Sequence, residues 1–75
     1  MKLTKAASLR IKELCQERNL TIYALAKNGG MEKNTLYQIE DCKDVKLTTI
    51  YEVCSTLGIS LKTFFDSPVF DEIMD

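Results

Sequence analysis

The apolar residues of this chain recur at helical spacing in short segments separated by polar or glycine-containing stretches. Residues 5 to 18 place Ala7, Ile11 and Leu14 at i, i+4 and i+7, which predicts a first helix with one apolar face. Residues 47 to 57 predict a further helix by the same criterion. The apolar residues expected on its buried face are Leu47, Ile50, Val53, Cys54 and Leu57.

Residues 21 to 40 predict two short helices joined by one tight turn. Thr21 stands where a hydroxyl can accept a hydrogen bond from a first-turn N–H, and this helix is expected to end at Asn28. Gly30 can adopt the positive φ that a sharp exit from a helix needs. The next helix spans about 32 to 40. The apolar residues of the segment predict one buried face that holds Leu25, Ala26, Met31, Leu36 and Ile39. Such a pair is typical of a helix-turn-helix, whose second helix enters the major groove of DNA.

The last helical segment is short and bounded by small residues. Gly58 is expected to end the preceding helix, and Ser60 to cap a fifth helix that runs through about Phe65 and stops before Pro68. Phe64 and Phe65 are both expected to be buried and to supply the largest share of apolar area. The pattern predicts an all-α fold of five helices with the helix-turn-helix at the second and third.

Residues 1–66 are expected to form one domain, and residues 67–75 an acidic C-terminal tail. The apolar residues of the tail alternate with acids and are Val69, Phe70, Ile73 and Met74. One amphipathic turn docked on the body, the same turn docked on a second subunit, and a frayed end are all compatible with this pattern.

Composition limits the classes of protein. A chain of 75 residues has room for one domain, and 45% hydrophobic with 28% charged residues is ordinary for a soluble globular protein. No apolar run approaches the length of about 18 residues that a membrane span needs, and the first residues lack the apolar stretch of a signal peptide. We therefore expect a cytoplasmic protein that has no membrane partner.

The net charge of −1 conceals an uneven distribution. Residues 1 to 65 hold ten Lys and Arg and seven Asp and Glu, which is a net charge of +3. Residues 66 to 75 hold four acids and no base, which is a net charge of −4. A mildly basic body with an acidic tail is compatible with a DNA-binding module.

The side chains used in catalysis and metal binding are scarce. Cys15, Cys42 and Cys54 are widely spaced, form no Cys-x-x-Cys pair and have no histidine to complete a zinc site, so free thiols are expected. Cys54 is expected in the core and Cys42 exposed in a loop. No nucleophile with an adjacent base and no Gly-rich phosphate loop is present, so we expect no enzyme, cofactor, metal or small-molecule ligand.

The outward face of residues 32 to 40 carries side chains suited to base edges. Asn34 and Gln38 can bond an adenine bidentately, Lys33 can donate to guanine, and Tyr37 can reach a thymine methyl or a phosphate. Residues 41 to 46 read as a polar loop in which Lys43 and Lys46 can meet phosphates. The same residues are also typical of an ordinary solvated helix face with surface lysines. Contact with DNA and simple solvation therefore both stay open as interpretations.

A family resemblance is carried by a series of residues at matching spacing: Arg10-Ile-Lys-Glu-Leu through Leu20-Thr21, Leu25-Ala26, Gly30-Met31, Thr35-Leu36, Ile39-Glu40, and Leu57-Gly58-Ile59-Ser60 with Phe64-Phe65. Over about residues 8 to 65 the chain resembles the lambda-repressor-like, Cro-type helix-turn-helix family, also called the xenobiotic-response-element family. The resemblance implies a compact five-helix DNA-binding domain of bacterial or phage regulators, usually repressors that bind two-fold symmetric operators as homodimers.

Carried over position by position, the family's base-reading sites fall on Lys33, Asn34 and Gln38, with Tyr37 beside them. The resemblance places phosphate contacts at Thr21 and Ile22, where the second helix starts, and at Cys42, Lys43 and Lys46 in the loop.

Two functions follow from these observations. The first is a sequence-specific regulator that binds double-stranded DNA, supported by the helix-turn-helix pattern. The second is a protein-interaction module on the same fold, such as an antitoxin-like or regulatory subunit, supported by the acidic tail and by Asp41 and Asp44 around the loop.

Overall fold

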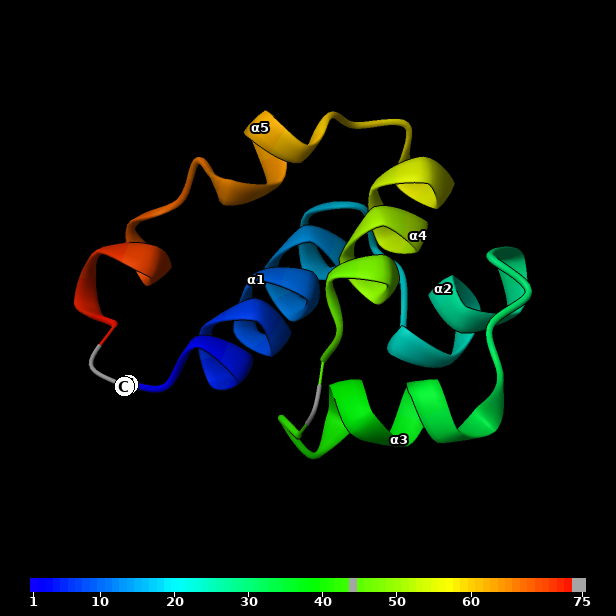
Figure 1. The fold of residues 1–75 in the computed structure, drawn as a ribbon. Coiled ribbons are helices and arrows are strands. Elements are labelled where there is room, and N and C mark those ends of the chain that lie inside the picture. The colour runs from blue at the N-terminus through cyan, green and yellow to red at the C-terminus, as the bar shows by residue number, and fades with distance from the viewer. Residues whose placement is uncertain (44, 74–75) are drawn as a thin grey trace.

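The computed structural model describes residues 1–43 and 45–73, and over these residues the chain is all-helical, as predicted (Figure 1). Asp44 of the loop and Met74 and Asp75 of the tail lie outside the described residues. The elements are α1 (Leu3–Glu17), α2 (Ile22–Asn28), α3 (Lys33–Glu40), α4 (Leu47–Leu57), α5 (Leu61–Phe65) and the 3-10 helix η1 (Pro68–Glu72).

The helix ends follow local side-chain and backbone chemistry. Thr21 Oγ1 accepts a hydrogen bond from the Ala24 N–H at 3.0 Å, and Ser60 Oγ accepts one from the Thr63 N–H at 3.0 Å. Gly30 and Gly58 have φ of 65° and 70°, in the left-handed region that glycine adopts without a Cβ clash. These capping and turn predictions are confirmed, because each depends on residues only a few positions apart.

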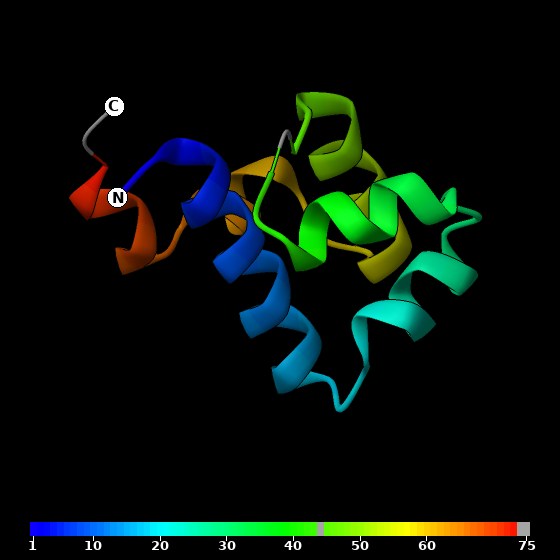
Figure 2. The same ribbon diagram turned by 90° about the horizontal axis from the view of Figure 1, so that it is seen from below.

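The core lies around α1, which runs through the middle of the molecule with α2, α3 and α4 packed beside it (Figures 1 and 2). The predicted α1 face is buried, with Ala7, Ile11 and Leu14 each no more than 2% exposed. The other fully enclosed apolar residues come from every remaining α-helix and include Leu25, Ile39, Val53, Cys54 and Phe64.

The helix-turn-helix is formed by α2 and α3, which pack against each other (Figure 2). Leu25, Ala26 and Ile39 are buried in it as predicted, whereas Met31 and Leu36 are only half-buried. The far end of α3 therefore rests on α1, and the turn end stands away from the center of the core.

Two predictions of burial are wrong. Leu47 is 70% exposed, because it is the first residue of α4 and Val45, from the loop, packs against the core at that end instead. Phe65 is 39% exposed, because the α5 backbone directs Phe64 inward and leaves its neighbor at the edge, where the two rings meet edge to face at 5.1 Å.

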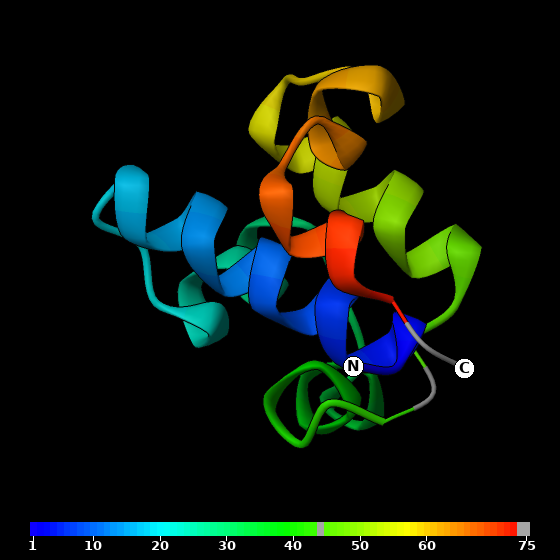
Figure 3. The same ribbon diagram turned by 90° about the vertical axis from the view of Figure 1, so that its left-hand side faces the viewer.

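The tail docks on the body of the same chain, which was one of the three possibilities. Pro68 begins η1, whose turn packs against α1 (Figure 3). The ring centroid of Phe70 lies 6.0 Å from that of Phe64 and 5.0 Å from that of Phe65. The Met1 ammonium donates a hydrogen bond to the Glu72 carbonyl at 3.1 Å. Residues 68–72 therefore cover part of the core.

Arg10 connects α1 to α5 from a buried position, and nothing in the pattern along the chain predicts this. Arg10 is 7% exposed. Its guanidinium donates from Nε to the Phe64 carbonyl at 2.7 Å and from Nη2 to the Thr63 carbonyl at 2.9 Å. Its third nitrogen, Nη1, bonds the Glu13 carboxylate. The Phe64 carbonyl, at the C-terminus of α5, thus receives a donor that the helix does not supply, and the Thr63 carbonyl, which already accepts from the Asp66 N–H at 3.2 Å, receives a second one.

Candidate nucleic-acid interface

The exposed face of α3 presents its polar side chains in two stripes. Asn34 and Gln38 are four residues apart and form one stripe, and Lys33 and Tyr37 form the other. Lys33, Asn34 and Tyr37 are exposed and Gln38 is half-buried, while Ile39 anchors the opposite side of the helix in the core. Both stripes are therefore available to a ligand that approaches α3 from solvent.

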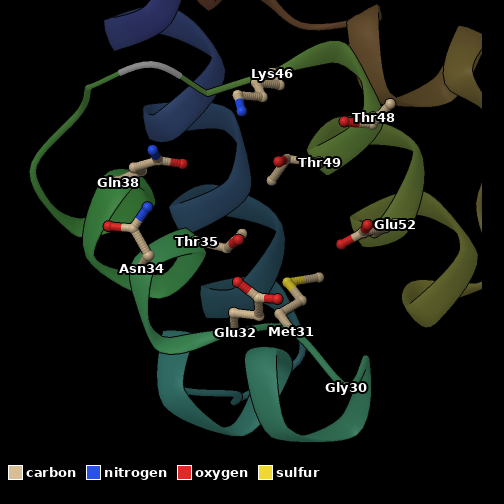
Figure 4. Close-up of a pocket in the computed structure, with 10 residues that line it drawn as sticks. All are labelled: Gly30, Met31, Glu32, Asn34, Thr35, Gln38, Lys46, Thr48, Thr49 and Glu52. Carbon is tan, nitrogen blue, oxygen red and sulfur yellow. The ribbon is translucent and has the colours of Figure 1, made fainter.

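A polar hollow of about 340 Å³ separates α3 from the start of α4 (Figure 4). Asn34 and Gln38 line it from α3, and Lys46 and Thr48 line it from the start of α4, across from them. The structure thus brings Lys46, from the loop, beside the predicted base-reading stripe.

Lys33 lies on the other side of α3, in a smaller hollow of about 210 Å³ between α2 and α3. Tyr23 and Lys27, which are four residues apart on α2, line this hollow with it, over a floor of Ala26, Met31 and Leu36. Sequence reasoning missed Tyr23 and Lys27, although their spacing places them on one face of α2 opposite the buried Leu25.

The loop after α3 holds Cys42 in an unusual conformation. Cys42 has φ of 58°, and its backbone N–H bonds the Ile39 carbonyl at 3.3 Å. The prediction of an exposed thiol is wrong: Cys42 is half-buried, since Lys12 Nζ lies 3.8 Å from its Sγ and also donates to the Glu40 carbonyl at 3.1 Å. Lys43 is exposed beside it and does not line either hollow.

Acidic side chains lie among these residues. Glu32 and Glu52 both line the polar hollow, opposite in charge to Lys46 (Figure 4). Glu32 is the N-cap residue of α3, yet its side chain makes no capping hydrogen bond. The first-turn N–H groups of α3 thus donate no hydrogen bond to this side chain, and the carboxylate adds negative charge at the start of α3.

The remaining thiols are structural. Cys15 and Cys54 are buried, as predicted for Cys54, and burial raises the pKa of both thiols above its ordinary value, which disfavors the reactive thiolate. Within residues 1–43 and 45–73, no group of three or more His, Cys, Asp or Glu side chains is placed to hold a metal ion. No helix of the described part of the chain is long and apolar enough to cross a bilayer.

Comparison with known proteins agrees with this geometry. A family model described as a Cro/C1-type helix-turn-helix DNA-binding domain matches residues 10–68. The crystal structure of the prophage Lp1 protein 11 superimposes with a TM-score of 0.84 and 37% sequence identity, over 97% of this chain and 100% of that chain. No curated protein matches the chain.

Proposed function

Because this chain belongs to the Cro/C1-type helix-turn-helix family of DNA-binding domains, we propose that it is a sequence-specific transcriptional repressor that reads operators as a homodimer. The observation that carries the proposal is the polar hollow, where Asn34 and Gln38 on α3 stand beside Lys46. α3 enters a major groove, with the two α3 helices of a dimer in successive grooves about 34 Å apart.

The proposed division of contacts follows the chemistry of each side chain. Asn34 and Gln38 bond adenine edges, Lys33 donates to guanine, and Tyr37 meets a thymine methyl or a phosphate. Thr21 at the start of α2 and Lys43 and Lys46 in the loop hold phosphates, which sets the register without reading sequence. The protein needs no cofactor for this activity and acts in the cytoplasm, where its operator DNA lies.

Selection of bound sites from random DNA tests the function. We expect a palindrome whose half-sites are one helical turn apart, because two identical α3 helices related by a two-fold axis must contact identical sequences. A selection that yields no enriched site even at low salt contradicts the proposal.

Substitutions in the stripe of Asn34 and Gln38 and in the loop should separate sequence reading from phosphate binding. Asn34→Ala and Gln38→Ala are each expected to cost about 1 to 3 kcal/mol on the selected site and to relax the preference at one base pair. Lys43→Ala, the matched comparison, is expected to weaken all sequences alike and to reduce the salt dependence. Competition titrations against scrambled DNA measure both effects. Equal loss on every sequence for Asn34→Ala would show that this residue does not read bases.

A second prediction concerns the Glu32 carboxylate, which stands at the start of α3 without capping the helix. Glu32→Thr is expected to raise DNA affinity up to about tenfold, since it removes a charge that repels phosphate and supplies a hydroxyl cap. Glu32→Gln separates the two causes, because it removes the charge and keeps the length of the side chain. Affinity unchanged in both variants, measured on the same operator at fixed salt, would place Glu32 away from the DNA backbone.

The second candidate function, a protein-interaction module with weak or no DNA binding, is supported by Glu32 and Glu52 in the hollow. The exposed Asp71 and Glu72 on η1 add to this support. A salt titration distinguishes the two functions, because phosphate contacts make affinity fall steeply with salt. Absence of binding to mixed DNA at low salt favors the interaction module.

A further inference from the structure

Gly29 ends α2 at a point where α4 passes very close. A Cβ atom at this position would lie 2.6 Å from Thr56 Oγ1 on α4 and 3.1 Å from the Met31 methyl. A carbon atom normally keeps about 3.5 Å from its non-bonded neighbors. The methyl would have to yield only a little, whereas the contact with Thr56 could not exist without a larger movement. Thr56 therefore excludes a side chain at residue 29.

The backbone of Gly29 does not itself require glycine. Its φ of −87° and ψ of −1° lie in the right-handed region that every residue adopts. Gly30 is the opposite case: its φ is 65°, and a Cβ there would meet no atom of the described residues within 4 Å beyond its chain neighbors. The two adjacent glycines thus serve different needs, since Gly30 turns the chain and Gly29 leaves room for α4.

Thr56 is held in its place against Gly29. Its Oγ1 donates a hydrogen bond to the Glu52 carbonyl, one turn earlier on α4, at 2.8 Å. A β-branched side chain also has few χ1 rotamers available in a helix. The Met31 methyl, in contrast, is the end of a flexible side chain that can move aside. A side chain at residue 29 would therefore push α4 itself away from the turn.

The polar hollow lies directly beyond this contact. The turn lines one end of it, beginning with Gly30, the residue after Gly29. Glu52, one turn before Thr56, lines its α4 wall, and Lys46 stands at the end opposite the turn (Figure 4). The width of the hollow between α3 and the start of α4 therefore depends on how closely α4 approaches the turn.

We propose that Gly29 is a positioning residue for DNA recognition. Its contact with Thr56 sets the distance between the base-reading stripe of α3 and Lys46. The inference rests on the proposed function, in which Asn34 and Gln38 of that stripe read bases while Lys46 holds a phosphate. A side chain at residue 29 would open the contact by about 1 Å. A binding site tolerates a misplacement of only about 0.5 Å, so the two sets of contacts could no longer form together.

The first test measures binding of the selected operator by the full chain. Gly29→Ala is expected to bind about tenfold more weakly, which corresponds to the loss of one good base contact. Thr56→Ala removes Oγ1 from the contact and should by itself leave affinity near that of the wild type. Gly29→Ala combined with Thr56→Ala is therefore expected to regain wild-type affinity to within about twofold, a non-additive result typical of residues in direct contact.

Two controls isolate the contact. Gly29→Ala combined with Thr56→Val keeps a γ-carbon where Oγ1 stood, so this variant should bind as weakly as Gly29→Ala alone. Gly30→Ala instead introduces strain at a positive φ, which Thr56→Ala should not relieve. Wild-type affinity in Gly29→Ala, or a loss that Thr56→Ala does not restore, overturns the proposal.

Circular dichroism establishes whether each variant folds. If Gly29→Ala does not fold, the proposal requires that Gly29→Ala combined with Thr56→Ala folds and binds the operator, because the clash has been removed. A double variant that is also unfolded overturns the proposal.

A measurement without DNA separates this inference from the proposed function. In NMR spectra of the amide groups, Gly29→Ala should shift the Lys46 backbone signal and the side-chain signals of Asn34 and Gln38, and Thr56→Ala should return them. Shifts confined to the neighbors of residues 29 and 56 refute the positioning role and leave DNA recognition standing. Signals that move and return in a protein whose wild type binds no DNA support the positioning of the hollow and refute the proposed function.

Discussion

Replacing Arg10 with methionine is expected to lower the free energy of unfolding by about 1 to 3 kcal/mol. The substitution keeps an apolar stem of similar length and removes the guanidinium that bonds the Phe64 and Thr63 carbonyls at 2.7 and 2.9 Å. The Phe64 carbonyl is then left without a partner in a buried place, which costs about 1 to 3 kcal/mol, whereas the Thr63 carbonyl keeps its bond from the Asp66 N–H. The bond to Glu13 adds little, because the Glu13 side chain is 49% exposed and solvent screens it.

Urea denaturation followed by circular dichroism measures this loss. Arg10→Lys should recover only part of it, because an ammonium cannot reach two carbonyls and a carboxylate in the geometry of a planar fork. Arg18→Met is the matched control, since Arg18 is the other arginine of the chain and the C-cap residue of α1, its side chain is 35% exposed, and it makes one 3.3 Å bond to the Leu14 carbonyl. An Arg10→Met variant as stable as Arg18→Met would show that the connection between α1 and α5 contributes nothing.

Phe64→Ala is expected to cost about 3 to 5 kcal/mol, the range observed when a buried aromatic is truncated and leaves a cavity. Phe64 is fully enclosed, and its ring centroid lies 5.1 Å from that of Phe65 and 6.0 Å from that of Phe70. A domain of this length has a total stability of about 4 to 11 kcal/mol, so the variant should be partly unfolded at room temperature. Phe64→Leu retains most of the volume and gives a folded variant in which a smaller loss can be measured.

Phe65→Ala is the informative comparison, because the chemical change is the same at the neighboring position. Phe65 is 39% exposed, so its truncation is expected to cost about 1 kcal/mol, mainly through lost contact with Phe64 and Phe70. Thermal and urea unfolding of the two alanine variants side by side measures the difference. Similar losses would mean that Phe65 is buried in solution, through a rearranged α5 or through contact with another molecule.

The helices, their ends and the helix-turn-helix could be predicted along the chain because they depend on short-range interactions. The caps at Thr21 and Ser60 each need a backbone N–H three residues on, and the turns need glycine at positions with positive φ. The i, i+3 and i+4 spacing of apolar residues likewise requires no knowledge of where a helix will pack. The family pattern is built from these same local elements, so it was visible in the sequence.

Three features of the fold and of the candidate site could not be predicted without the tertiary structure. Arg10 meets carbonyls more than 50 residues further along the chain, as its bonds to Thr63 and Phe64 show. The apolar spacing of α4 is compatible with Leu47 facing either the core or solvent. Leu47 is exposed because Val45 packs against the core at that end of the helix. Lys46 joins Asn34 and Gln38 only because α4 starts across from α3.

The sequence by itself therefore determined which segments are helical, where they start and stop to within two residues, and which family they form, because backbone hydrogen bonds and side-chain periodicity act over a few residues. Only the tertiary structure decided which of two adjacent phenylalanines fills the core, which side chains share the hollow beside α3, and which leucines remain on the surface. These outcomes depend on the angles at which helices pack. Those angles are set by contacts between residues far apart in the chain, which no local pattern records.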